Sequence, residues 1–160
     1  HTHPIDVSNL ILQLTNCRIV RDNKLIKEDL WIRDGVILDP LKIFYEEKKQ
    51  ADLQIDCENL IIAPGLIDVQ LNGAFGRDFS NDPDITDCLK TVSEKLLQFG
   101  VTAYCPTIIS SEPSVYKEVL PKIKKTTNKE SEQSAQVLGV HLEGKFYIHK
   151  IYIFLYLKQL

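Results

Sequence analysis

The 160-residue sequence contains no methionine, no closely spaced cysteine pair and no long apolar run. Because even an initiator methionine is missing, we expect the chain to begin inside a longer product or to be a fragment. No apolar run approaches the roughly 20 residues of a membrane-spanning helix, so we expect no such span. Residues 1–9 lack a basic start followed by an apolar core, which argues against a signal peptide there.

The net charge argues against some classes of partner, and the cysteine spacing indicates the cellular compartment. The formal net charge of −3 argues against nucleic acid or an anionic membrane surface as a main partner. Cys17, Cys57, Cys88 and Cys105 lie far apart and form no C-x-x-C motif. Such spacing is typical of reduced, mostly buried thiols, and we therefore expect a cytoplasmic protein.

The first 63 residues predict a flexible lead, residues 1–9, followed by a small antiparallel β unit, residues 10–63. The predicted elements of this unit are strands at Leu12–Val20 and Leu53–Cys57, a hairpin of Leu30–Arg33 and Val36–Leu38 around Asp34-Gly35, and a surface loop at Phe44–Asp52. An irregularity is expected at Asn16. The unit is too short to bury a large core by itself, so it should pack against the remainder of the chain.

The stretch Leu60–Ser80 organises the rest of the chain. Two apolar runs, Leu60–Ala63 and Leu66–Leu71, flank Pro64-Gly65 and indicate two buried strands separated by a change of direction. Polar residues and glycines follow the second run. A buried strand that carries polar groups at its carboxyl end is how α/β folds build sites.

Beyond this stretch the apolar period becomes helical, and helices then alternate with strands. We predict a helix capped by Asp82, with Pro83 at its first position and Gly100 at its end. Its expected apolar positions are Ile85, Cys88, Leu89, Val92, Leu96 and Phe99. The further predicted elements are a strand at Val101–Ile109, a helix at Ser114–Lys125 divided by Pro121, a loop at Thr126–Gln136 and a third buried strand at Val137–Leu142.

This β-α-β-α-β order predicts an α/β fold with three parallel strands. Either a (β/α) barrel or a doubly wound sheet satisfies it, and the small β unit favours the barrel. Polar residues stand at the carboxyl ends of the three strands: Gln70 and Asn72, Thr107, and His141 and Glu143. Side chains two apart point the same way, so each pair can enter one cavity. His141 and Glu143 suit a divalent metal ion; the alternative is a satisfied core histidine and a solvated glutamate.

Three blocks carry a family resemblance: PGLIDVQLNGAFGRDFS, VTAYCPTIISS and VLGVHLEG. They resemble the N-acetylglucosamine-6-phosphate deacetylase family of the amidohydrolase superfamily, from about Leu12 to Gly144. The resemblance implies an incomplete (β/α)₈ TIM-type barrel, its first three strands in residues 64–144, preceded by part of a small β-sandwich. It also implies hydrolysis of N-acetylglucosamine 6-phosphate to glucosamine 6-phosphate and acetate, a small-molecule reaction of amino-sugar catabolism.

The same resemblance implies one divalent metal ion, zinc or similar, with Glu143 as a ligand. Gln70 and Asn72 stand where many amidohydrolases have an H-x-H metal motif, as in family members with a single metal. Gln70, Asn72, His141 and Thr107 are expected to line the site. The other ligands and the catalytic aspartate belong to later strands, and the full-length form is compatible with a homodimer.

Residues 145–160 depart from the family pattern, which continues HLEG with Pro-Phe. This segment holds 5 of the 13 aromatic residues and no acid. Gly144-Lys145-Phe146 can be encoded with the splice-donor sequence GTAAGT, so we interpret the tail as a translated intron; a genuine alternative C-terminus is the competing interpretation. We expect the chain alone to be inactive. An amidohydrolase of cyclic amides, for which H-x-H would be expected, and a non-catalytic fragment remain alternatives.

Overall fold

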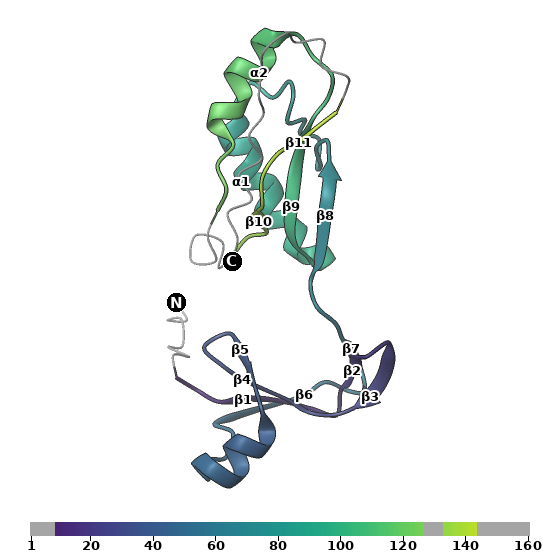
Figure 1. Cartoon of the computed structure of the whole chain (residues 1–160), viewed down its shortest axis with the longest axis vertical. Coiled ribbons are helices and arrows are strands. Elements are labelled where there is room, and N and C mark those ends of the chain that lie inside the picture. The colour runs from purple at the N-terminus through teal and green to yellow at the C-terminus, as the bar shows by residue number, and fades with distance from the viewer. Residues whose placement is uncertain (1–8, 127–132, 144–160) are drawn as a thin grey trace. The chain divides into compact units, whose positions relative to one another are not determined.

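The structure is a computed structural model that describes residues 9–126 and 133–143. The chain divides between Pro64 and Gly65 into two compact units, each of which is described by itself (Figure 1). Residues 1–8 of the expected lead, which was predicted for residues 1–9, and the divergent tail at 145–160 lie outside the described residues. Within the part of the chain that the structure describes, no helix is long and apolar enough to cross a membrane.

The first unit consists of short strands in two sheets. Its elements are β1 (Leu12–Thr15), β2 (Arg18–Arg21), β3 (Lys24–Lys27), β4 (Leu30–Arg33), β5 (Val36–Leu38), a π-helical turn at Lys42–Glu47, β6 (Leu53–Asp56) and β7 (Ile61–Ile62). One sheet has the order β5-β4-β1-β6 and the other β3-β2-β7. The buried residues Cys17, Ile19 and Leu30 form its small core.

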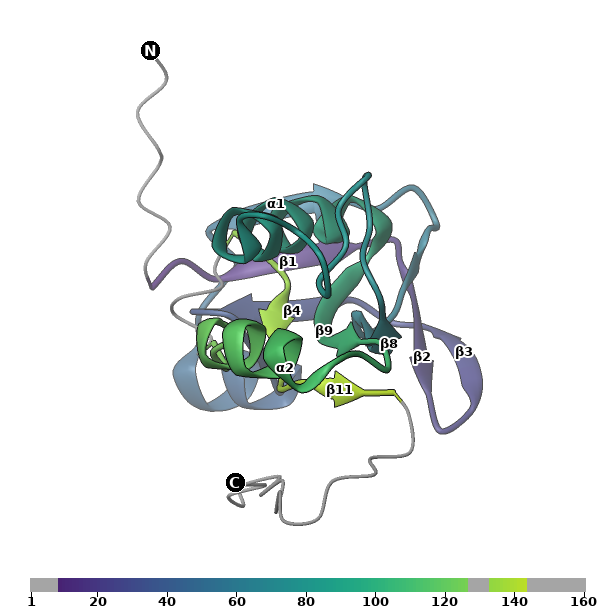
Figure 2. The same cartoon turned by 90° about the horizontal axis from the view of Figure 1, so that it is seen from above.

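Two hairpins result from turn chemistry. The predicted β4–β5 hairpin is confirmed, with φ of 52° at Asp34 and 76° at Gly35. Asp22 and Asn23 adopt similar positive φ values, 50° and 59°, in the β2–β3 hairpin (Figure 2). Positive φ at both central residues matches the twist of antiparallel strands, and Asp, Asn and Gly adopt it at low cost.

Three expectations for this unit were wrong. The predicted strand Leu12–Val20 is two strands in different sheets, because Asn16 has φ of 50° and ends β1. The unit is not purely antiparallel, since β1 pairs in parallel with β6 and β2 with β7. The predicted loop at Phe44–Asp52 begins inside the π-helical turn Lys42–Glu47, which buries only Ile43.

The second unit is a mixed α/β structure around one long strand. Its elements are β8 (Leu66–Leu71), α1 (Ile85–Leu96), a 3₁₀ turn at Leu97–Phe99, β9 (Val101–Ile108), α2 (Pro113–Val119), a 3₁₀ turn at Leu120–Lys122, β10 (Gln136–Val137) and β11 (His141–Leu142). Strands β8, β10 and β11 all pair in parallel with β9, which confirms the predicted parallel strands. The predicted single strand Val137–Leu142 is instead two short strands, β10 and β11.

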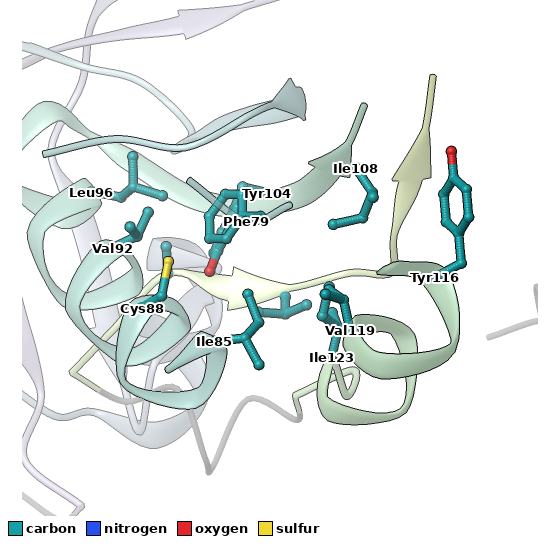
Figure 3. Close-up of a cluster of buried hydrophobic side chains, with 12 residues drawn as sticks. Phe79, Ile85, Cys88, Val92, Leu96, Tyr104, Ile108, Tyr116, Val119 and Ile123 are labelled. Atoms are coloured by element: carbon teal, nitrogen blue, oxygen red, sulfur yellow. The ribbon is translucent and has the colours of Figure 1, made fainter. Parts of the chain in front are cut away.

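Both helices cover the same face of β9 and form the main core (Figures 1 and 3). Tyr104 and Ile108 of β9 are completely buried against residues of α1 and α2. The Tyr104 ring stacks on Phe79 with 6.0 Å between centroids. Its hydroxyl lies 2.9 Å from Ser93 Oγ, and burial raises the pKa of Tyr104 to about 12. This packing holds the loop after β8 against the sheet.

Helix α1 begins later than its sequence suggests. Asp84, not Asp82, is the N-cap: its carboxylate accepts hydrogen bonds from the amides of Thr86 and Asp87. Gly100, with φ of 74°, follows the last turn as predicted. The expected apolar position Phe99 is wrong, because this ring lies beyond the helix in the 3₁₀ turn and is 65% exposed.

The prediction that the apolar runs Leu60–Ala63 and Leu66–Leu71 form buried strands was also wrong. Leu66, Ile67 and Val69 of β8 are 62%, 59% and 65% exposed, and Ile61 of β7 is 49% exposed. Among the described residues β8 pairs only with β9, and the two helices cover β9. The apolar side chains of β8 are therefore not covered by a second layer of described residues.

Candidate functional site

Two amides and one carboxylate meet where β8 and β11 end. The side-chain amide nitrogen of Gln70 lies 2.6 Å from Glu143 Oε1, and that of Asn72 lies 3.0 Å from the same oxygen. A carboxylate oxygen only accepts hydrogen bonds, so both amides donate. The structure thus brings Gln70 and Asn72 together with Glu143, which lies more than 70 positions further along the chain.

The main chain fixes Glu143 on both sides. Strand β11 pairs His141 with Thr107 and Leu142 with Ile108 of β9. The Glu143 amide then donates to the Ile108 carbonyl at 3.0 Å, and its carbonyl accepts from Ser110 Oγ at 3.1 Å. The carboxylate therefore projects from a backbone held by β9.

The amide donors give Glu143 its electrostatic character. Hydrogen bonds from Asn72, and then from Gln70, hold the pKa of Glu143 below its ordinary value, while desolvation opposes them. Neutral donors stabilise the ionised form without cancelling its charge. Glu143 therefore keeps its negative charge without a cationic partner among the described residues.

Two other predicted site residues have different surroundings. His141 is half-buried, and its Nδ1 lies 2.9 Å from the Val69 carbonyl oxygen. Thr107 is completely buried, and its hydroxyl donates to the Cys105 carbonyl at 3.2 Å. Thr107 thus makes its hydrogen bond within β9, whereas His141 joins β11 to β8.

The described residues fit one part of a metal site. Glu143 Oε2 accepts no hydrogen bond from any described residue, which leaves one oxygen of an ionised carboxylate open. Among residues 9–126 and 133–143, no group of three or more His, Cys, Asp and Glu side chains could hold a metal ion. The donor set suits a single ligand of a divalent metal, and further ligands would have to come from elsewhere.

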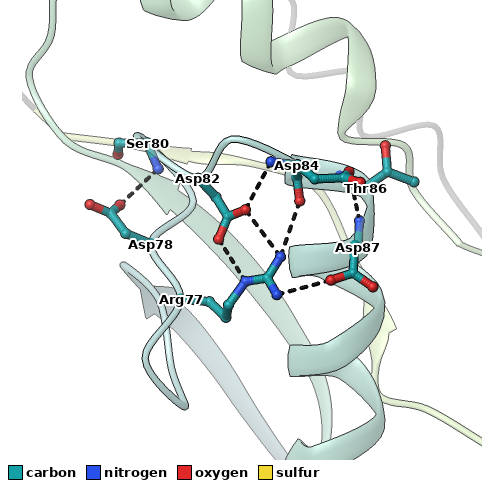
Figure 4. A network of polar contacts seen from close by, with 7 residues as sticks. All are labelled: Arg77, Asp78, Ser80, Asp82, Asp84, Thr86 and Asp87. Atoms are coloured by element: carbon teal, nitrogen blue, oxygen red, sulfur yellow. Dashed lines mark hydrogen bonds and ion pairs between the residues drawn. The ribbon is translucent and has the colours of Figure 1, made fainter.

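Sequence reasoning missed a second polar cluster, which lies in the loop before α1 and in the first turn of that helix (Figure 4). Arg77 bonds Asp82 through two nitrogens, at 2.6 and 3.0 Å, and Asp87 at 2.9 Å. It also donates to the Asp84 carbonyl. The available signal was the presence of four aspartates in residues 78–87 directly after one arginine. Asp82, expected to cap α1, instead binds Arg77.

Similar proteins are found among curated sequences and among solved structures. No protein-family profile matches the chain. The chain is 52% identical over 137 residues to N-acetylglucosamine-6-phosphate deacetylase of Rattus norvegicus, covering 85% of this chain and 33% of that protein. It is 45% identical over 149 residues to the same enzyme of Caenorhabditis elegans, covering 91% and 35%. The chain spans about a third of the length of these relatives.

A solved structure shows the same similarity in three dimensions. The N-acetylglucosamine-6-phosphate deacetylase of Pasteurella multocida superimposes with a TM-score of 0.62 at 27% identity, covering 84% of this chain and 34% of that one. The proteins matched by sequence and by fold thus belong to one class, the deacetylases of a sugar phosphate. Within it, the chain is homologous to about one third of N-acetylglucosamine-6-phosphate deacetylase.

Proposed function

We propose that this chain is part of a metal-dependent hydrolase that removes acetate from N-acetyl-D-glucosamine 6-phosphate to give D-glucosamine 6-phosphate, in amino-sugar catabolism. The observation that carries the proposal is the convergence of Gln70 and Asn72 on one oxygen of Glu143. The names of the relatives supply the substrate and the reaction.

In this proposal Glu143 is a ligand of one divalent metal, zinc or a similar ion. The two amides orient the carboxylate and favour its ionised form, so that Oε2 would be available to hold the ion. The bound ion would acidify a water molecule and polarise the acetamide carbonyl. No imidazole pair stands at positions 70 and 72, which disfavours the alternative of a cyclic-amide hydrolase with an H-x-H motif.

The architecture proposed for the whole enzyme is a (β/α)₈ barrel of which β8, β9 and the β10–β11 segment are the first three strands. Residues 10–63 are then part of a small β-sandwich and residues 64–144 the start of the barrel. Four free cysteines support a cytoplasmic location, and a homodimer is the proposed assembly of the full-length form. The single carboxylate of the described site leads us to expect no turnover from this chain alone.

A chimera tests the function directly. Residues 65–143 of this chain replace the matching part of the Pasteurella multocida enzyme, and acetate release from N-acetylglucosamine 6-phosphate is measured with and without a chelator. We expect metal-dependent release. Glu143→Gln should reduce it by at least about 100-fold, because loss of a ligand should cost no less than loss of a residue that only supports one. The matched control is Glu118→Gln, at a side chain 72% exposed, which should leave the rate unchanged.

Equal rates for the Glu143→Gln and Glu118→Gln chimeras would overturn the role of Glu143. Metal-dependent acetate release by the 160-residue chain itself would overturn the expected inactivity of the chain alone.

A further inference from the structure

Strand β8 carries a bulge directly before the candidate site. Its register with β9 shifts between the pairs Asp68–Tyr104 and Leu71–Pro106, so Val69 and Gln70 together oppose Cys105 alone. Two residues against one define a β-bulge, which locally bends the strand and re-aims a side chain. The side chain that this bulge directs is Gln70, which donates to Glu143 at 2.6 Å.

A bulge leaves a main-chain group without its ladder partner. Here the Val69 carbonyl accepts a hydrogen bond from His141 Nδ1, at 2.9 Å. A carbonyl has no hydrogen to donate, so Nδ1 carries the hydrogen and, in the neutral ring, Nε2 carries the lone pair. His141 is itself held in place by its pairing with Thr107 of β9.

Three hydrogen bonds therefore join the end of β8 to the end of β11, and the imidazole makes the one that reaches the main chain of the bulge. The other two are the amide bonds from Gln70 and Asn72 to Glu143. His141 and Glu143 are two positions apart on the same strand end, as are Gln70 and Asn72 on the other. Fixing Val69 by the first bond fixes the backbone from which Gln70 projects.

We propose that His141 is a positioning residue that holds the Val69–Gln70 bulge and thereby aims Gln70 at Glu143. It acts through the main chain of β8 and through its Nδ1–H tautomer. The inference rests on the proposed function only in taking Glu143 as the functional carboxylate.

The test uses the ¹⁵N-labelled 160-residue chain, because its readouts do not require activity. Long-range ¹H–¹⁵N correlation spectra report the tautomer of His141, and we expect Nδ1 to be the protonated nitrogen. The side-chain NH₂ signals of Gln70 and Asn72 report their bonds to Glu143. We expect each of them to contain one strongly downfield-shifted proton.

Three variants test whether His141 acts through its hydrogen bond to Val69 or only through the space that its side chain fills. In His141→Asn the side-chain NH₂ occupies the place of Nδ1–H, so this variant should preserve the shifted Gln70 signal. His141→Gln moves the donor one bond further out, and His141→Leu removes it; both should lose the shifted signal. In the chimera, His141→Leu should lower acetate release about 10- to 100-fold, and His141→Asn should restore it.

An Nε2–H tautomer, or a Gln70 signal that is the same in the Asn and Leu variants, would overturn the inference. Because these spectra are recorded without substrate, the inference can fail while the chimera is active. Equally, an inactive chimera with the expected spectra would refute the proposed function and leave the positioning role in place.

Discussion

Two polar clusters of the second unit hold their carboxylates in opposite ways. The Asp82 side chain is 7% exposed. It accepts hydrogen bonds from two nitrogens of Arg77 and from the Asp84 amide, so both of its oxygens have donors. Glu143 receives two neutral amides on one oxygen, and its other oxygen accepts no hydrogen bond from the described residues. In the first cluster, here called the closed cluster, the Asp82 carboxylate is already paired with the Arg77 cation. In the second, Glu143 has no cationic partner among the described residues.

The difference separates a structural use of a carboxylate, at Asp82, from the proposed ligand role of Glu143. Both carboxyl groups have a lowered pKa: Arg77 is the main cause for Asp82, and Asn72 is the main cause for Glu143. A paired arginine cancels the charge that it stabilises, whereas amides leave the charge available. A lowered pKa alone therefore does not identify a site; the kind of donor does.

Gly73 lies between the two clusters, and changing it should have the largest effect. A Cβ at this position would overlap the Arg77 carbonyl and approach Asp78 Cα at 2.9 Å, both main-chain atoms that cannot rotate away. We expect Gly73→Ala to destabilise the unit by about 3 kcal/mol, the upper end of the usual cost of overpacking. Urea denaturation followed by circular dichroism measures it.

The matched control is Gly76→Ala in the same loop. A Cβ there meets nothing within 4 Å, and only its φ of 78° opposes alanine. The expected cost is about 1 kcal/mol, that of a left-handed conformation. Equal losses for the two variants would contradict the extra cost that we assign to the close approach of the main chain at Gly73.

Removing the cation of the closed cluster should have the next largest effect. Arg77→Leu leaves the Asp82 carboxylate, which is almost fully buried, without its charged partner. We expect a clearly lower denaturation midpoint, partly restored by the additional change Asp82→Asn. The control is Lys122→Gln, since the Lys122–Glu118 pair is exposed and should contribute little. A midpoint for Arg77→Leu equal to that of the control contradicts a stabilising role.

Acid should weaken the closed cluster at a predictable pH. Because the folded-state pKa of Asp82 is lowered, its contribution is fully present above the unfolded pKa, about 4, and is lost as the pH falls through the folded value. Unfolding free energies measured between about pH 5 and pH 2 should therefore fall with pH. Asp82→Asn should flatten this slope, and an unchanged slope would argue against the pair.

The sequence predicted the strand ends better than it predicted the loops. The spacing of Gln70, Asn72 and Glu143 at strand ends was enough to expect them together, because parallel strands end at one edge. The choice between Asp82 and Asp84 as helix cap could not be predicted from the sequence, because it depends on which of the two carboxylates pairs with Arg77. The bulge at Val69 was equally hidden, because it arises from the register of β8 against β9 and has no local signal in the sequence.

The smallest structural change tests the central claim most directly. Gln70→Met and Asn72→Leu keep the approximate side-chain volume and remove the two amide donors, and the closed cluster should remain intact. The measurement is a ¹³C NMR titration of the Glu143 carboxyl group in the chain and in this double variant. We predict a pKa below the ordinary glutamate value of about 4.3 in the chain and a rise in the variant. An ordinary pKa in the chain, or the same pKa in both proteins, would contradict the claim that neutral amides hold Glu143 open for a cation.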